Sequence, residues 1–220
     1  MNTDTCEHCA LKPSLCHGVD GQLGVAGCMS FNHEHCVSWG WTCVCNPELL
    51  SERLQEVRNF DCDLEGDLRP VIDLPPRYIP TIYHRFPGAK PVQTTWAAVP
   101  LHFLFTQSES GKLRPIADSA VELRRVLGVE SQTKIVVTGP GPDDFLEHFW
   151  RFHRTERLLE RIAALEPSFF TVPNFSFFLD APPMHNRYNR SRSLRIAERA
   201  SAAGLATVLH LNALHGAEWN

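Results

Sequence analysis

The spacing of hydrophobic residues changes along the chain and divides it into three parts. Residues 1–46 show no sustained apolar period. From Pro47 to Asn59, leucine and valine recur at helical spacing, which predicts a short amphipathic helix. Residues 61–80 are acidic and rich in proline, which is typical of an extended connection. We therefore predict a Cys/His-rich metal-binding module over residues 1–46, a helix and Pro-rich connection over 47–78, and an α/β domain over 79–220.

Within the third part, short apolar runs alternate with helical ones. Runs rich in β-branched and aromatic residues predict strands over residues 79–84, 97–105, 134–138, 168–172 and 206–211. Helices are expected between them, with starts at Asp118, Asp144 and Asn189 and a restart at Thr155. This alternation predicts right-handed crossovers and a mainly parallel sheet. Because five strands are too few for an eight-stranded barrel, the sheet should be open or form an incomplete, barrel-like structure.

Composition narrows the class of protein without naming its partners. The chain has 220 residues, and its 43% hydrophobic content is enough for a real core. A formal net charge of -4 argues against coating nucleic acid or an anionic membrane by bulk charge. Its first residues carry no secretory signal, and its apolar runs are too short and too polar to span a bilayer. We therefore expect a cytoplasmic protein.

Cysteines are concentrated at the start of the chain. Seven of the eight precede Pro47, and crowded thiolates without a secretory signal point to metal rather than disulfides. The histidines among them favour zinc, whereas the absence of a second Cys-x2-Cys pair keeps an iron–sulfur cluster as the alternative. Some of these thiols could instead be buried small hydrophobes, and Cys43 with Cys45 could form a redox pair. The predicted metal ligands are Cys6, Cys9, Cys16, Cys28, Cys36, Cys43 and Cys45.

Polar groups of several kinds gather after the predicted strand at 168–172. Loops at the carboxyl ends of parallel strands hold the ligand in α/β proteins. Asp180 and His185 are candidate catalytic acid or base residues, and the arginines that follow could clamp an anion. A competing interpretation is that the polar side chains satisfy turn backbone, cap a helix and form its solvated face. The candidate ligand-binding residues are Asn174, Ser176, Arg187, Arg190, His210 and Asn212.

Two weaker features do not change this picture. The loop over residues 138–144 contains two glycines and two prolines, and is better interpreted as a turn plus a helix cap than as a phosphate loop. Four arginines between Arg151 and Arg161 recur at helical spacing, but glutamates lie among them. Intrahelical ion pairs explain that stripe more economically than nucleic-acid binding does.

One segment also carries a resemblance. Pro173-Asn174-Phe175-Ser176 follows a predicted strand, and an arginine-bearing helix and another strand come after it. In this order the segment resembles an uncharacterised bacterial and phage domain family of unknown function, in which a strand ends in Pro, Asp or Asn, Phe and Ser. The resemblance implies an α/β, barrel-like architecture and no defined reaction. The further matching residues are Asp180, Pro182, Arg190, Arg192 and Gly204.

Two functions are compatible with these features. The first is a metal-binding α/β protein whose strand-end loops bind an anionic or phosphate-bearing small molecule, a nucleotide or a nucleic acid, as a hydrolase or transferase. The second is a non-catalytic interaction subunit stapled by its metal, with a protein partner or a second copy of itself. The sequence does not decide whether the protein is an enzyme.

Overall fold

The computed structural model describes Thr42 and residues 47–83, 92–108, 111–178, 181 and 183–210. The chain forms two compact units. Unit 1 consists of Met1–Asp63, Ser176–Arg192 and Leu211–Asn220, and unit 2 consists of Leu64–Phe175 and Ser193–His210. The predicted metal-binding module over residues 1–46 lies almost wholly outside the described residues.

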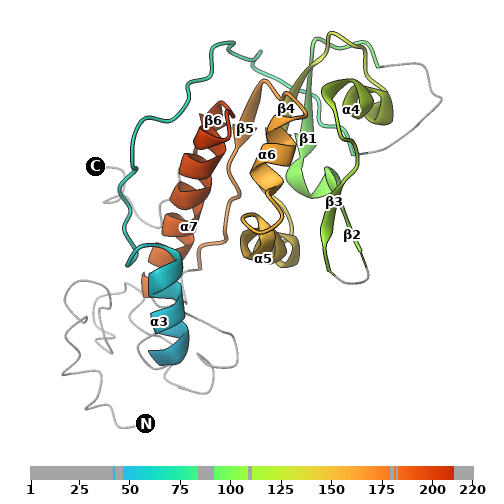
Figure 1. The fold of residues 1–220 in the computed structure, drawn as a ribbon. Coiled ribbons are helices and arrows are strands. Elements are labelled where there is room, and N and C mark those ends of the chain that lie inside the picture. Colours follow the sequence, from blue (N-terminus) through green and yellow to red (C-terminus); the bar gives the residue numbers. More distant parts are fainter. Residues whose placement is uncertain are drawn as a thin grey trace. The chain divides into compact units, whose positions relative to one another are not determined.

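A four-stranded sheet in the order β1-β4-β5-β6 forms the centre of unit 2. Its strands are β1 (Trp96–Pro100), β4 (Lys134–Thr138), β5 (Phe169–Thr171) and β6 (Thr207–Val208). Every neighbouring pair is parallel. The predicted α/β class and mainly parallel sheet are confirmed, and the described strands form an open sheet and not a closed barrel (Figure 1).

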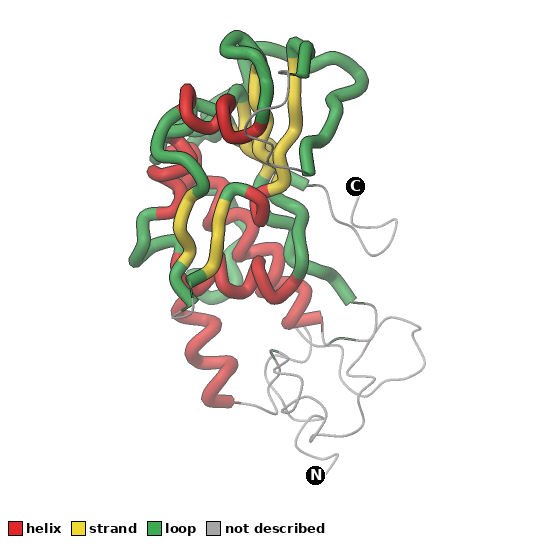
Figure 2. The backbone as a smooth tube through the Cα atoms, turned by 90° about the vertical axis from the view of Figure 1, so that its right-hand side faces the viewer, coloured by secondary structure: helices red, strands yellow, loops and turns green. Residues whose placement is uncertain are grey.

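The two faces of this sheet differ in what covers them. On one face, Val99, Val137 and Phe170 are completely buried. Figures 1 and 2 show helices α4 (Ala120–Leu127) and α6 (Leu158–Ala163) on one side of the sheet. The other face forms a separate core cluster of Trp96, Ala98, Val136 and Phe169, against which Val71 and Ile79 pack from an extended segment. Two-sided burial explains why these strands contain continuous apolar runs.

A small antiparallel sheet was not predicted. It pairs β2 (Phe105–Gln107) with β3 (Leu113–Pro115), and Figure 2 shows it as a separate set of yellow strands. The predicted strand over residues 97–105 is therefore wrong in its second half. After Pro100 the chain forms a 3-10 turn, η1 (Leu101–Phe103), and only then enters β2. The predicted strand over residues 79–84 is reduced, in its described part, to one bridge between Thr81 and Ala98.

Helix starts differ from the predicted ones by one to six residues. Ser119, not Asp118, caps α4: its side chain accepts from the Glu122 N–H, and the helix ends at Gly128 with φ 65°. Helix α5 (Asp143–Phe152) has no side-chain cap, because Pro142 precedes it. Helix α6 begins after Arg157, whose backbone is left-handed. The last helix, α7, spans Pro183–Ala202 and includes the predicted cap Asn189 in its interior.

In unit 1, helix α3 (Pro47–Glu56) ends in an unusual turn. Arg58, Asn59 and Phe60 all have positive φ, between 53° and 60°. Left-handed backbone costs a non-glycine residue about 1–2 kcal/mol, so packing has to hold this turn in place. Phe60 provides that packing, since it is fully buried and its ring meets the Tyr188 ring edge-on, 6.1 Å between centroids.

Of the helices in the described part of the chain, none combines the length and the apolar character needed to cross a membrane.

Candidate functional site

The amino-terminal half of α7 is polar, yet it is buried. A surface helix normally turns such residues toward water, and a buried polar side chain has to find partners inside the protein. The structure therefore builds a polar cluster in unit 1 around this half-helix. The buried polar residues of α7 in unit 1 are His185, Asn186, Asn189, Ser191 and Arg192, each less than a tenth exposed.

Two of these side chains are used to hold backbone. Asn186 accepts from the Phe178 N–H at 3.0 Å and donates to the Phe178 carbonyl at 2.8 Å. Asn189 donates to the Ser176 carbonyl at 2.6 Å. These three bonds tie the loop that begins at Ser176 to the helix. The competing interpretation from sequence expected Asn189 to cap a helix. Asn189 does bond to backbone, but it does so from inside α7 and not as a helix cap.

His185 is held neutral at the centre of the cluster. Its Nδ1 accepts from the Thr42 N–H at 3.3 Å. Burial, and after it the positive charges of Arg53 and Arg192, lower the pKa of His185 to about 3. At neutral pH this ring is an uncharged hydrogen-bonding group. Its low pKa also makes it a poor catalytic base at neutral pH, because a catalytic base works best with a pKa near the pH of the reaction.

Two arginines lie against one tyrosine ring beside His185. The guanidinium carbons of Arg53 and Arg192 are 4.5 and 4.6 Å from the centroid of the Tyr188 ring. The Tyr188 hydroxyl donates to Glu56, and burial is the main cause that raises the pKa of this phenol, so it stays protonated. Arg192, only 2% exposed, also donates to the Asn189 side-chain oxygen at 2.6 Å.

Arg53 differs from the other cations of this cluster in its partners. It is half-buried, donates to the Thr42 hydroxyl at 2.9 Å, and otherwise contacts the Tyr188 ring. Among the residues that the structure describes, no carboxylate forms an ion pair with it. A hydroxyl and an aromatic face leave a guanidinium with unused donors. The cluster thus contains a partly desolvated positive charge that an anion would neutralise.

The two arginines predicted as anion clamps are less central. Arg187 is exposed on α7, and its Nε donates to the Phe60 carbonyl at 3.2 Å. Arg190 is half-buried, with its guanidinium 5.6 Å from the Phe177 ring centroid. Ser176 joins the cluster through its carbonyl oxygen. The structure thus brings Ser176, His185, Arg187 and Arg190 into one unit, on the helix and the loop that precedes it.

The predicted residues Asn174 and His210 belong to unit 2 instead. Asn174 follows β5 and is half-buried. His210 lies two residues beyond β6, and its Nε2 is buried and has no hydrogen-bond partner among the residues that the structure describes. Burial lowers the pKa of His210. A second such histidine, His102 after β1, has a buried Nδ1 that finds no partner in the described part of the chain, and burial also lowers its pKa. Both follow the carboxyl ends of strands.

The carboxyl edge of β4 is tied tightly to β5. Gly139 donates its N–H to the Thr171 hydroxyl at 2.8 Å. A Cβ at position 139 would lie 2.1 Å from the Val172 carbonyl oxygen, so no residue other than glycine fits without a backbone shift. This close approach explains one of the glycines of the loop at 138–144, and it requires no ligand.

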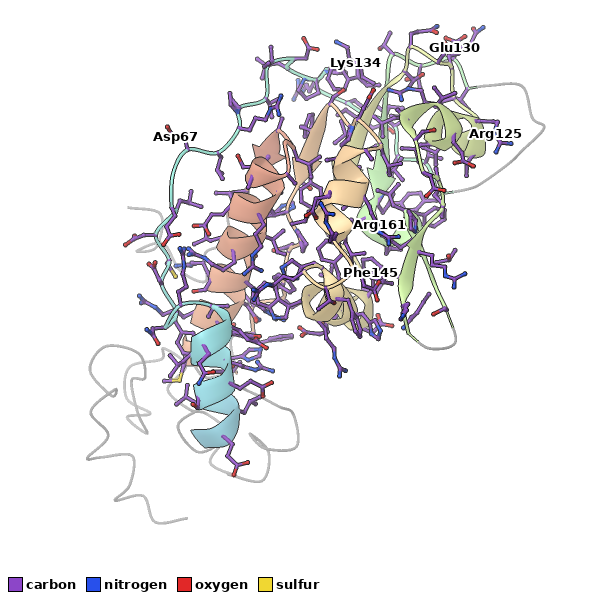
Figure 3. All side chains as sticks on the ribbon, viewed as in Figure 1. Asp67, Arg125, Glu130, Lys134, Phe145 and Arg161 are labelled. Atoms are coloured by element: carbon purple, nitrogen blue, oxygen red, sulfur yellow. The ribbon has the colours of Figure 1, made fainter. Side chains whose placement is uncertain are left out.

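An open pocket of about 790 Å³ lies at the opposite, amino edge of the sheet. Figure 3 labels two of its residues, Lys134 and Glu130, at the end of the sheet away from Phe145 of α5. Lys134 is already engaged there, with its Nζ 2.9 Å from Asp73 and 5.1 Å from the Trp96 ring centroid. None of the predicted site residues lines this pocket.

The predicted metal site cannot be placed. The seven amino-terminal cysteines, together with Asp180 and Asn212, lie outside the described residues. Within the described part of the chain, no group of three or more His, Cys, Asp or Glu side chains is arranged to hold a metal ion. The described cysteine, Cys62, is free, and its Sγ is 3.5 Å from the Ser191 hydroxyl.

Three members of the cluster, Arg53, Tyr188 and Arg192, are not among the ligand-binding residues predicted from sequence, although Arg192 belongs to the arginines considered there as anion clamps. A start of α7 at Pro183 would have indicated two of them, because His185, Tyr188 and Arg192 then recur at helical spacings of three and four. Arg53 gave no such signal, since an arginine on an amphipathic helix is ordinarily solvated.

Comparisons of this chain with protein-family models, with curated proteins and with solved structures find no match. The cluster therefore has to be interpreted from its own geometry.

Proposed function

We propose that the protein is a metal-binding α/β protein that binds an anionic, phosphate-bearing ligand through the polar cluster of unit 1. Arg53 carries the proposal, because its half-buried guanidinium has only a hydroxyl and an aromatic ring as partners among the described residues. A phosphate accepts the forked hydrogen bonds that a guanidinium offers. Arg192 adds a second buried charge next to the same Tyr188 ring.

In this proposal His185 contributes a hydrogen bond rather than a charge. Its low pKa keeps the ring neutral at physiological pH, so the positive charge of the site comes from the arginines alone. The affinity of the site for its anion should then not change between pH 8 and pH 5, except where the ligand itself ionises. The catalytic roles predicted for Asp180 and His185 remain a hypothesis, to be tested once a ligand is known.

A metal centre in the cysteine-rich module is the second part of the proposal. It rests on the thiolate density of residues 1–46, with zinc as the first choice and an iron–sulfur cluster as the alternative. No step of a reaction is assigned to it. Its proposed role is to fold a segment that has too little apolar content to fold alone.

Isothermal titration calorimetry with ATP and with inorganic pyrophosphate tests the anion site. Arg53→Ala should weaken binding by about tenfold or more, since it removes a charge-assisted contact, and Arg53→Lys should recover part of the loss. Arg58→Ala is the matched control. It removes the same charge from the turn that follows α3, from a side chain whose guanidinium lies 3.9 Å from Asp61.

Thermal unfolding of each variant separates lost binding from lost folding. Equal dissociation constants for Arg53→Ala and Arg58→Ala would refute the site. Failure of the folded wild-type protein to bind either phosphate probe would refute the function.

The non-catalytic alternative is favoured by a different observation. Asn186 and Asn189 are committed to the backbone of residues 176–178, as expected when a polar cluster serves only to hold a loop. Under this alternative the arginine variants change stability and no ligand binds. The same calorimetric series therefore decides between the two functions.

A further inference from the structure

Unit 2 contains an extended segment that is fixed at both ends. We call residues Pro70–Pro80 the strap; Figure 1 shows it as part of the long teal trace without helix or strand. Next to its first residue, the Arg69 carbonyl accepts from the Thr207 N–H at 3.1 Å. At its other end, the Pro80 carbonyl accepts from the Ala98 N–H at 2.8 Å. The strap is thus attached to β6 at one end and to β1 at the other.

Side chains of the strap divide into an inward and an outward set. Val71 and Ile79 pack against the core cluster of the sheet. Ile72, Leu74 and Tyr78 are 87%, 84% and 79% exposed. Soluble proteins seldom leave several large apolar side chains exposed in one short stretch, and such a stretch often marks an interaction site. The inward residues fix the strap, so the outward ones are presented on a stable support.

The middle of the strap has a restricted backbone. Pro75 and Pro76 have φ held near -65°, and each proline also confines the residue before it to extended conformations. Residues 74–76 carry no helix or strand hydrogen bonding in the structure. This combination favours a polyproline II conformation, which leaves the backbone open to a partner. Arg77 and Tyr78 follow directly, both exposed.

We propose that Leu74-Pro75-Pro76-Arg77-Tyr78 is a docking segment for a partner domain with an aromatic-lined groove that binds polyproline II. Such grooves stack aromatic rings against prolines, and a nearby large side chain provides a further anchor. Tyr78 suits this role because its ring is exposed and it follows Pro76 by two residues. The proposal is independent of the anion site, which lies in unit 1.

Attachment at both ends gives the proposal a quantitative consequence. A free peptide has to be ordered when it binds, whereas the strap is already extended and held. The intact protein should therefore bind the same groove more tightly than a peptide of residues 70–80. A difference of about fivefold or more is expected even if the ordering of only one residue is spared on binding.

A purified WW domain that binds Pro-Pro-x-Tyr peptides is a suitable probe. In a competition assay, the full chain displaces a fluorescein-labelled Pro-Pro-x-Tyr peptide from the WW domain. The dissociation constant of the full chain should be lower than that of the unlabelled 70–80 peptide. Tyr78→Ala and Pro76→Ala should each weaken it by about tenfold. Val121→Ala is the matched control, because Val121 is 80% exposed but lies on α4, outside the strap.

Three results would overturn the proposal. The first is binding by the peptide but not by the full chain, which would mean that the strap is not accessible. The second is equal affinity of the wild-type protein and Tyr78→Ala. The third is a wild-type dimer in analytical ultracentrifugation that Tyr78→Ala converts to a monomer, because the strap would then be covered by a second copy of this chain.

Discussion

His153 should make unit 2 sensitive to mild acid. This side chain is 3% exposed at the end of α5. Its Nδ1 donates to the Trp150 carbonyl oxygen at 2.6 Å, and its Nε2 accepts from the Arg199 guanidinium. Both nitrogens are occupied in a way that only the neutral ring allows. Burial, followed by the charges of Arg199 and Arg154, lowers the pKa of His153 to about 4.

The sign of the effect follows from the two pKa values. In the unfolded chain the ring titrates near pH 6.5. Below that pH the unfolded state binds a proton that the native state does not, so the free energy of unfolding falls as the pH falls. Between pH 7.5 and pH 5 the loss from His153 alone is about 2 kcal/mol, and it approaches about 3 kcal/mol below pH 4.

Urea unfolding followed by tryptophan fluorescence measures this loss. The comparison is between the wild-type protein and His153→Gln, whose side chain does not titrate but retains an acceptor for Arg199. The remaining low-pKa histidines, His102, His185 and His210, contribute equally to both proteins. The variant should therefore lose about 2 kcal/mol less than the wild type between pH 7.5 and pH 5. Parallel pH profiles for the two proteins would refute the reasoning.

Three further predictions use other parts of the chain. Gly139→Ala should lower the unfolding temperature far more than Gly66→Ala, because the new Cβ would meet the Val172 carbonyl at 2.1 Å, whereas at Gly66 nothing lies within 4 Å and only the positive φ of 81° opposes a side chain; similar shifts would contradict this. Tyr188→Phe should cost about 2 kcal/mol in urea unfolding at pH 7, since it removes the hydrogen bond to the Glu56 carboxylate. Prolonged chelation should remove a metal and make residues 1–46 sensitive to protease; elemental analysis that finds no metal in the purified protein would exclude the site.

The best-predicted elements are those in which the local preference of the residues agrees with their packing in the folded protein. Strand β4 has the predicted bounds of 134–138, because a β-branched run is bounded on one side by polar residues and on the other by Gly139. Helix α4 ends at Gly128, where the left-handed cap favours glycine. In both places local preference and tertiary packing agree, so the sequence pattern is sufficient.

The errors arise where two elements share one apolar run. Residues 97–105 contain enough apolar residues for a long strand, but the chain leaves the sheet after Pro100 and starts β2 at Phe105. Apolar content alone does not separate a strand from a buried 3-10 turn such as η1, in which Leu101 is fully buried. The antiparallel partner of β2 was missed because β3 has only three residues.

The candidate site is harder to predict, because α7 reverses the usual relation between polarity and exposure. The polarity of residues 183–192 predicts Asn189 as a helix cap and leaves two interpretations of the arginines open, an anion clamp and a solvated face. The structure buries Asn189 and Arg192 instead. The partners of this half-helix come from residues distant in sequence: Thr42 donates to His185, and Arg53 lies over the Tyr188 ring.

The energetics of this burial favour a binding role over a purely structural one. Desolvating a guanidinium such as that of Arg192 costs several kcal/mol, and replacing buried charges by apolar side chains of similar size is often neutral or stabilising. Stability alone therefore gives little reason for Arg53 and Arg192 to share the Tyr188 ring beside a histidine that is kept neutral. An anion that binds between such groups would recover part of the desolvation cost, and the protein should then gain stability on binding phosphate. A rise in the unfolding temperature of the wild-type protein with pyrophosphate, absent in Arg53→Ala, would show that the buried arginines are stabilised by a bound anion.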